Sequence, residues 1–365
     1  MGLTSHPRHI AWLEVEIESA PDTGLGIAPH TIKDVVAILR HATERGLAVQ
    51  VWGGGTHSGY GNPRDPDLIM SMEHFDEVER WEPDDLTIVV GAGAGIADVE
   101  SRLVERSQSL VMSERPGRGT IGGAIAAGVS PLRRGRLYGI RERVLEVTMV
   151  TGDGRLIRSG GRVVKNVTGY DLHRLAVGAF GSLGVITSVC LKLWPTPPAA
   201  ATVTLDDPGQ AADITRPLAL LDVNGVTRLY LWGTDREVDG QVARLKGESA
   251  PGHDWPADPT GAWGWSLRVP PSQTSEAVAR LPDGWRHVAV HGVGEIRAGS
   301  ESPDGAGELR EWAESLGGRL VMTRGAPDRF DPWGSPPPAL DLQRRLIAQF
   351  DPQRVINPGR LAGGL

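Results

Sequence analysis

Apolar residues recur at helical spacing in some segments of the chain and form short unbroken runs in others. Residues 31–46, TIKDVVAILRHATERG, carry an apolar stripe with a period of three to four and end on Gly46, which predicts an amphipathic helix. Residues 96–107 predict a second helix, and three short apolar runs predict strands at 47–52, 67–72 and 86–93. This part of the chain therefore alternates strands and helices, with glycines where strands end.

The pattern changes in the middle of the chain. Residues 143–161 predict a hairpin around a Gly-Asp-Gly turn, and residues 182–198 predict a long strand that prolines end. We interpret 195–208 as a linker, because prolines bound it. Strand-like and helix-like segments then alternate through 200–325, which predicts a compact α+β domain with a mainly antiparallel sheet. A helix and a polar tail end the chain.

Composition narrows the classes of function. The chain has 365 residues, which is long enough for two domains. Its net charge of -7 argues against nucleic acid as the main partner. Cys190 is the only cysteine, so an internal disulfide and an iron–sulfur cluster held by this chain alone are excluded. Residues 1–30 lack the apolar core of a signal peptide, and the expected compartment is the cytoplasm.

Three glycine clusters stand out against this background, at 53–55, 115–130 and 177–187. Consecutive small residues let backbone N–H groups converge on an anion, usually a phosphate. Residues 91–98, GAGAGIAD, fail the dinucleotide fingerprint because Ile96 occupies the third glycine position, and the chain has no Walker loop. A tight turn explains any one cluster, but three together favour a large cofactor that carries phosphate.

Four motifs in order carry a family resemblance: WGGGTHSGYG, PGRGTIGGAIAAG, VVKNVTGYDLHRLAVGAFGSLGVITSVCLKLWP and the terminal INPGR. They resemble the FAD-binding domain of the PCMH-type flavoproteins, also called the vanillyl-alcohol-oxidase type. Within that group the chain is most similar to the FAD-binding subunits of bacterial glycolate oxidase. The resemblance implies an α+β fold in which two subdomains clasp FAD beside a small α+β cap domain. The expected boundaries are 1–198 for the FAD-binding domain, 199–330 for the cap and 331–365 for a segment that returns to the flavin.

The resemblance also implies which residues hold FAD. The glycine loop would wrap the pyrophosphate, and the second cluster would line the pyrophosphate and ribityl region. The strand at 184–186 would hold the adenosine end, and the Asn357 turn would lie near the isoalloxazine ring. The full set of expected cofactor-binding residues is Gly53, Gly54, Gly55, Thr56, His57, Ser58, Pro116, Thr120, Ile121, Gly122, Gly123, Gly128, Gly184, Val185, Ile186 and Asn357.

One departure from the family pattern concerns the attachment of the flavin. Many relatives bind FAD covalently through a histidine directly after the glycine pair, in an Arg-x-Gly-Gly-His pattern. Here Trp52 stands at the arginine position and Thr56 at the histidine position, while His57 comes one residue late. We therefore expect FAD to be bound without a covalent link.

Other candidate residues have more than one interpretation. His287, His291 and Glu295 suggest a metal pair with a third ligand, although edge-strand histidines are the favoured interpretation. The arginine-rich stretch 131–143 suits a carboxylate substrate, an acidic partner protein or a solvated loop. In the most family-like run we expect a structural role, fixing a turn against the flavin domain, for a set of four residues: Lys165, Asn166, Tyr170 and Asp171.

Together these features predict an FAD-dependent oxidoreductase that is an FAD-binding subunit of a glycolate oxidase or dehydrogenase complex. It would oxidise glycolate, a small 2-hydroxy acid, to glyoxylate or relay its electrons. The expected partners are a second FAD-linked catalytic subunit and an iron–sulfur subunit, with the complex cytoplasmic or peripheral to the inner face of the membrane. The alternatives are a stand-alone FAD oxidase of a sugar or alcohol and a non-catalytic flavin-binding assembly subunit. The sequence identifies no catalytic residue and no resident metal.

Overall fold

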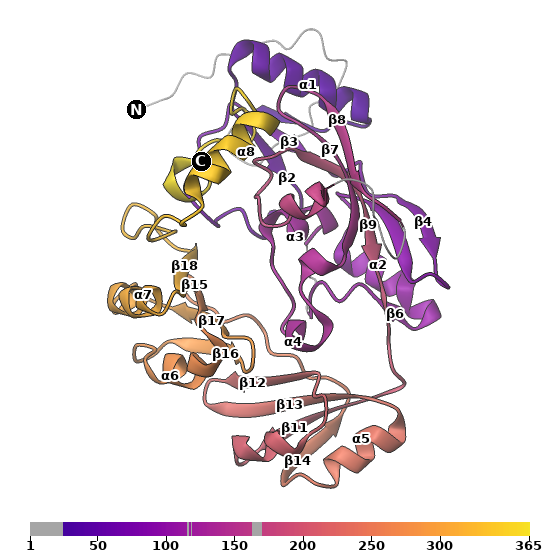
Figure 1. Cartoon of the computed structure of the whole chain (residues 1–365), viewed down its shortest axis with the longest axis vertical. Coiled ribbons are helices and arrows are strands. Elements are labelled where there is room, and N and C mark those ends of the chain that lie inside the picture. Colours follow the sequence, from indigo (N-terminus) through magenta and orange to yellow (C-terminus); the bar gives the residue numbers. More distant parts are fainter. Residues whose placement is uncertain (1–24, 115–116, 118, 163–169) are drawn as a thin grey trace.

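The chain folds into two parts that lie one above the other in Figure 1, and α8 returns to the first part. The computed structural model describes residues 25–114, 117, 119–162 and 170–365. We call residues 25–195 the N-terminal part and residues 199–324 the eight-stranded part. In the described residues no helix is both long and apolar enough to cross a membrane.

A small parallel sheet opens the N-terminal part, with strand order β1-β3-β2. Helix α1 (Ile32–Arg45) begins at a Thr31 capping box and ends at Gly46, whose φ of 64° is the left-handed conformation that glycine favours. Its apolar stripe packs against the sheet. The strands are β1 (Leu25–Ile27), β2 (Val49–Trp52) and β3 (Leu68–Ser71).

A second, five-stranded antiparallel sheet follows, with order β4-β5-β9-β7-β8. Helices α2 and α3 bury apolar side chains in the same core. The elements are β4 (Val78–Glu82), β5 (Thr87–Gly91), α2 (Ile96–Leu103), α3 (Ile121–Ala127), α4 (Arg134–Leu137), β7 (Val144–Val150), β8 (Leu156–Gly160) and β9 (Val185–Lys192), with β6 (Gln108–Ser109) pairing β10 (Trp194–Pro195).

The eight-stranded part is one antiparallel sheet with order β14-β11-β13-β12-β16-β17-β15-β18, as its alternating pattern predicts. The linker interpretation of 195–208 is wrong, because β11 already pairs with β13 across Ala199–Leu205. The strands are β11 (Ala199–Leu205), β12 (Ala219–Val223), β13 (Val226–Gly233), β14 (Gly247–Pro251), β15 (Trp263–Arg268), β16 (Arg286–Val290), β17 (Glu295–Ser300) and β18 (Arg319–Arg324). The helices are α5 (Asp235–Val242), α6 (Thr274–Ala279) and α7 (Ala306–Ser315).

The last segment returns to the N-terminal part, as Figure 1 shows for α8 (Leu340–Phe350). Val49 donates its N–H to Val355 O at 2.7 Å, and Asn357 donates its N–H to Val49 O at 2.8 Å. Ile356 is buried in the core of the small parallel sheet. The chain end is therefore fixed beside β2, where the first glycine cluster begins.

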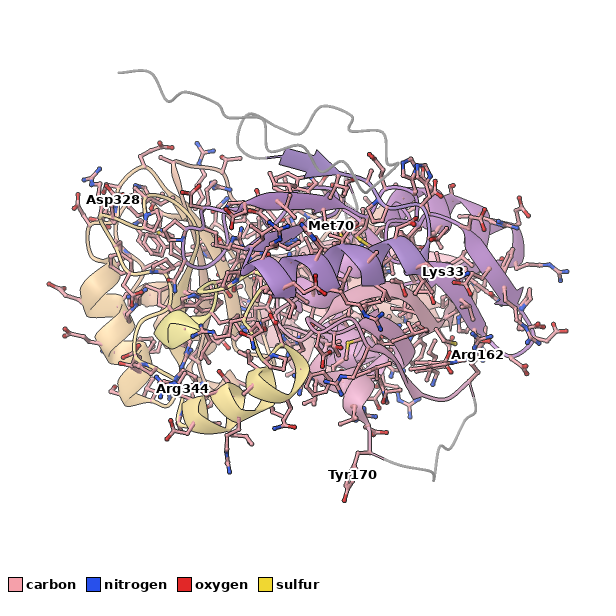
Figure 2. The ribbon with its side chains drawn as sticks, turned by 90° about the horizontal axis from the view of Figure 1, so that it is seen from above. Lys33, Met70, Arg162, Tyr170, Asp328 and Arg344 are labelled. Carbon is pink, nitrogen blue, oxygen red and sulfur yellow. The ribbon has the colours of Figure 1, made fainter. Side chains whose placement is uncertain are left out.

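Tyr170 does not pack against the N-terminal part. Its side chain is 88% exposed and stands out from the surface in Figure 2. Asp171 pairs with Arg174 at 3.4 Å, and both side chains are about half exposed. The expected packing role of this pair is therefore wrong, and Lys165 and Asn166 lie outside the described residues.

Candidate functional site

A cavity lies where the end of β2, helix α3 and the returning tail meet. Its wall combines the first glycine cluster, the start of α3, the third glycine cluster and two residues of the eight-stranded part. The residues expected to hold a cofactor that line it are Gly53, Gly54, Gly55, Thr56, His57, Ser58, Thr120, Gly122, Gly123, Ile186 and Asn357. The topology thus brings together segments that lie about three hundred residues apart in the sequence.

The glycine loop leaves backbone donors available at this cavity. Within the described part of the chain, no N–H group from Gly53 to His57 donates a hydrogen bond to another residue. A Cβ on Gly53 would lie 2.4 Å from Thr120 Oγ1, and Gly55 has a φ of +71° beside the Trp52 ring. Side chains are therefore excluded from this loop, and a row of unpaired N–H groups suits an anion.

In the second glycine cluster, the N–H groups at the start of α3 already donate hydrogen bonds, and the glycines allow close packing instead. Ile121 donates its N–H to Ala94 O and Gly122 to Ala92 O, at 2.9 and 2.7 Å, while Gly123 donates to Thr120 Oγ1 at 3.2 Å. A Cβ on Gly122 would lie 2.6 Å from Ala92 Cβ, so only glycine allows this close approach. The N–H groups of Ile121, Gly122 and Gly123 are therefore already used within the fold, unlike those of the first cluster.

Four of the expected cofactor residues lie outside the cavity wall. Ile121 is fully buried in the core, and Gly128 packs against Gly178. Gly184 directly precedes β9, and Val185 is its first residue and is fully buried. Pro116 lies outside the described residues.

The C-terminal tail holds the glycine loop in place. Arg360 donates from Nη2 to His57 O at 2.6 Å and from Nε to Tyr60 O at 3.2 Å. Asn62 donates from Nδ2 to the carbonyls of Gly359 and Leu361 at 2.9 and 3.0 Å. Arg360 was not predicted from the sequence, although it directly follows the Asn-Pro-Gly turn in the INPGR motif.

Asn357 is a constrained residue in the wall. It has a φ of 45°, and its Nδ2 donates to the carbonyl of Phe180, which has a φ of 51°. Asn357 Oδ1 is buried and has no hydrogen-bond partner among the described residues. Two left-handed non-glycine residues held together are a form of local strain that is typical of ligand sites. The free oxygen is an acceptor for a donor on the ligand.

The electrostatics of the loop also favour an anion. Burial lowers the pKa of Arg360 to about 9, with a further contribution from Arg64, and burial lowers the pKa of Arg64 to about 10. Within the described residues neither guanidinium forms an ion pair with a carboxylate. The pKa of His57 is also lowered, first by burial and then by Arg360, so its imidazole is neutral at pH 7. Arg360 lines the cavity, so an anion bound there would compensate its charge.

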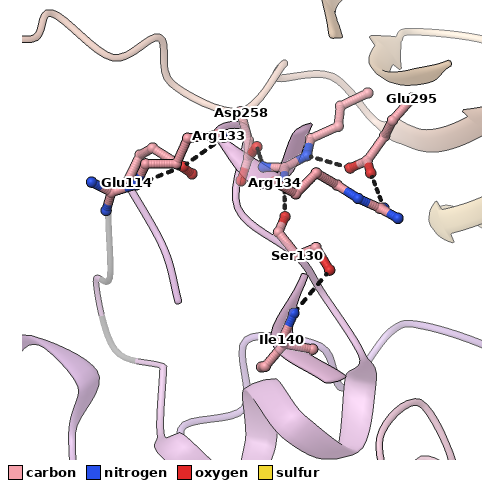
Figure 3. Close-up of polar contacts among 8 residues, drawn as sticks. Glu114, Ser130, Arg133, Arg134, Ile140, Asp258 and Glu295 are labelled. Atoms are coloured by element: carbon pink, nitrogen blue, oxygen red, sulfur yellow. Dashed lines mark hydrogen bonds and ion pairs between the residues drawn. The ribbon is translucent and has the colours of Figure 1, made fainter. Parts of the chain in front are cut away.

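The eight-stranded part closes the cavity through an ion-pair cluster, shown in Figure 3. Arg297 and Asp258 line the cavity and pair at 3.0 Å, and Arg297 Nη2 donates to Ser130 O at 2.6 Å. Glu295 binds Arg297 at 3.3 Å and Arg134 of α4 at 2.7 Å. Burial would raise the pKa of Glu295, but Arg297, Arg268 and Arg134 lower it below its ordinary value. The carboxylate is therefore ionised and joins the two parts.

This cluster corrects the interpretation of the arginine-rich stretch as a free docking surface. Arg134 is engaged with Glu295, and Arg133 pairs with Glu114 at 3.5 Å. Arg143 is 1% exposed and donates to Leu137 O at 2.5 Å. Arg141 remains exposed. Most of these arginines therefore hold the fold rather than a partner.

The suggested metal pair does not assemble either. His287 Nε2 lies 2.8 Å from Asp222 Oδ1, and Glu295 is occupied by arginines. The hydrogen bond from His287 lowers the pKa of Asp222. Within the described ranges no group of three His, Cys, Asp or Glu residues could hold a metal ion.

Comparison with known proteins adds to this geometry. Residues 25–160 match the family described as FAD binding domain. Residues 25–160 are a PCMH-type FAD-binding domain. The cofactor of this domain is therefore FAD. Free N–H groups, the uncompensated Arg360 and the free Asn357 oxygen all fit FAD, whose pyrophosphate is an anion and whose flavin ring carries a donor.

Two curated relatives and one solved structure place the domain in context. Glycolate oxidase subunit GlcE of Escherichia coli K12 is 28% identical over 305 residues, which is 78% of this chain and 84% of that protein. D-lactate dehydrogenase of Archaeoglobus fulgidus is 32% identical over 170 residues, 46% of this chain and only 38% of that protein. An alkyldihydroxyacetonephosphate synthase structure has a TM-score of 0.66 at 14% identity, covering 94% of this chain and 76% of that one, and so shares the fold.

We expect the FAD of this domain to dissociate on denaturation. Thr56 occupies the position at which relatives carry the linking histidine, and the backbone of His57 is held by Arg360. Unfolding the purified protein in guanidinium chloride and filtering it should leave the yellow colour in the filtrate. Flavin absorbance that stays with the polypeptide would contradict non-covalent binding.

Proposed function

We propose that the chain is the FAD-binding subunit of a complex that oxidises glycolate, or a closely related 2-hydroxy acid, to the 2-oxo acid. The similarity to GlcE, which covers 84% of that subunit, supports this assignment. The D-lactate dehydrogenase relative supports the substrate class, because lactate is also a 2-hydroxy acid. The bound FAD would supply the two-electron acceptor for the hydride of the carbinol carbon.

The observation that carries the proposal is a second cavity beside the FAD cavity. It lies between the N-terminal part and the eight-stranded part and measures about 890 Å³. The two cavities share Ala127, Ser130 and Phe180 in their walls. A small substrate in the second cavity would therefore lie next to the cofactor.

The electrons then have to leave the chain. Cys190 is its only cysteine, it is buried, and burial together with Glu146 raises the pKa of its thiol to about 11. A thiol of that kind is a poor metal ligand or redox group. We therefore propose that the electrons pass to partner subunits, one of them a second FAD-linked subunit and one an iron–sulfur protein.

The electron acceptor, either partner subunits or oxygen, distinguishes this function from that of a stand-alone oxidase. Purified chain supplied with glycolate and oxygen should form peroxide slowly, and addition of the partner subunits should raise dye reduction at least about tenfold. Added catalase should abolish the peroxide signal, which controls for other oxidants in the assay. Rapid peroxide formation by the chain alone, unchanged by partners, would contradict the subunit assignment.

A non-catalytic role in electron relay is the second candidate. In that case the partner's flavin would take the hydride, and this chain would only pass electrons on. Reduction of its FAD by substrate in the absence of partners distinguishes the two candidates.

A further inference from the structure

The second cavity has an unusual distribution of charge. Four arginines line it, Arg134, Arg141, Arg268 and Arg319, against two carboxylates, Glu142 and Glu314. Glu314 is used by Ser335, which donates its N–H and its hydroxyl to the carboxylate at 3.1 and 2.6 Å. Arg134 pairs with Glu295, which leaves Arg141, Arg268 and Arg319 against the two carboxylates, so the lining carries a net positive charge.

Two of these arginines lie opposite each other on neighbouring strands of the eight-stranded sheet. Arg268 at the end of β15 and Arg319 at the start of β18 are directly paired in the antiparallel register. Side chains of directly opposite residues lie on the same face, and like charges in such a pair destabilise a sheet. An anion between the two guanidinium groups would remove that repulsion.

Among the described residues, no carboxylate takes that place. The cross-strand neighbour of Arg268 on its other side is Glu295, whose two oxygens already bind Arg134 and Arg297. Within the described residues Arg268 forms no ion pair, and Arg319 donates from Nη2 only to the carbonyl of Ser335 at 3.2 Å. Arg134 and Arg297 thus occupy both oxygens of Glu295. The guanidinium group of Arg268 donates no hydrogen bond to a described residue.

The side chain of Tyr60 adds a hydroxyl group to the arginines that line the second cavity. Tyr60 lines the same cavity as Ser266, Arg268 and Arg319. Burial raises the pKa of the Tyr60 hydroxyl, while a hydrogen bond with Ser266 and the charges of the two arginines act to lower it. The net effect is a raised pKa, so the hydroxyl is protonated at pH 7 and is a donor. Its ring packs against Phe180 and Trp333, with ring centroids 5.0 and 5.7 Å apart. Phe180 lines both cavities, so the Tyr60 ring contacts a residue of their shared wall.

We propose that Arg268 and Arg319, assisted by the Tyr60 hydroxyl, bind the carboxylate of a small organic acid in this cavity. The inference rests on the proposed function in that the acid is the 2-hydroxy acid substrate. Guanidinium groups bind carboxylates through two parallel hydrogen bonds, which fixes the orientation of the ligand as well as its affinity. The carboxylate would thus be held at the sheet, and the carbinol carbon would extend toward the wall that the two cavities share.

Binding of oxalate tests this site without any turnover, because oxalate is a carboxylate that has no carbinol hydrogen to lose. Isothermal titration calorimetry on the FAD-loaded full chain should detect saturable binding. Arg268→Met and Arg319→Met should each weaken it at least about tenfold, the size expected when a charged hydrogen-bonding partner is lost. Tyr60→Phe should weaken it less, because one neutral donor is removed.

Arg236→Met is the matched control, because Arg236 is exposed on α5 away from the cavity and should bind oxalate as the unmodified chain does. Arg268→Met removes no hydrogen bond or ion pair within the described residues, so it should fold and keep its FAD even if Arg319→Met does not. Equal oxalate binding by the unmodified chain and Arg268→Met, or no binding at all, would overturn the site. Oxalate binding that depends on both arginines, without flavin reduction by any 2-hydroxy acid, would support the site and reject the proposed function.

Discussion

Gly54→Val is expected to purify as a folded protein without FAD. Gly54 is exposed and lines the FAD cavity, within the run whose N–H groups donate to no described residue. A valine side chain there would occupy the space that the pyrophosphate needs. If FAD still bound, each N–H that the valine separated from the phosphate would be buried and unpaired, at a cost of ~1–3 kcal/mol. The ratio of absorbance at 450 nm to that at 280 nm measures the loss.

Gly59→Val is the control for this change. Gly59 belongs to the same loop, and a Cβ there would meet only Thr323 O, at 4.0 Å, which is ordinary van der Waals contact. This variant should keep its flavin. If Gly54→Val retained full flavin occupancy, the assignment of the glycine loop to the pyrophosphate would be wrong.

Glu295→Gln is expected to lower the free energy of unfolding by about 3 kcal/mol, because removing one partner of a buried ion pair leaves the other charges uncompensated. Glu295 is 6% exposed and joins Arg134 of the N-terminal part to Arg297 of the eight-stranded part. Its pKa is lowered in the folded chain, so its contribution is present above the unfolded pKa and disappears as the pH falls through the folded value. Urea unfolding at pH 7 measures the difference.

Glu311→Gln provides the comparison, because Glu311 is an exposed residue of α7 and its loss should leave the urea midpoint nearly unchanged. A double-mutant cycle of Glu295→Gln with Arg134→Met should give a clear coupling energy. Equal midpoints for Glu295→Gln and the unmodified chain would show that this cluster does not hold the two parts together.

Sequence patterns correctly predicted the helices and strands whose formation depends on neighbouring residues. The apolar stripe of 31–46 and the Gly46 ending correspond to α1, because cap and stripe are properties of neighbouring residues. The hairpin around the Gly-Asp-Gly turn is present as β7 and β8. The strand β11 was missed, because flanking prolines resemble a linker while cross-strand pairing with β13 decides the structure.

Features of the site that depend on contacts between distant segments were harder to predict from the sequence. The first glycine cluster was found from its composition, but Arg360 holds that loop from about three hundred residues away. The arginines of 131–143 looked like a surface, because their partners Glu114 and Glu295 are remote in the sequence. The opposed pair of Arg268 and Arg319 requires the register of β15 and β18, which no local pattern specifies.

The central claim is that a 2-hydroxy acid delivers its electrons to the FAD of this chain. Anaerobic mixing of the purified FAD-loaded chain with excess glycolate or D-lactate, followed at 450 nm, tests it most directly. The account predicts that the flavin absorbance decreases in the absence of any partner subunit. The FAD-free Gly54→Val protein, treated in the same way, should show no change at 450 nm. Flavin that stays oxidised with each of these acids, and bleaches only after a second flavin subunit is added, would contradict it.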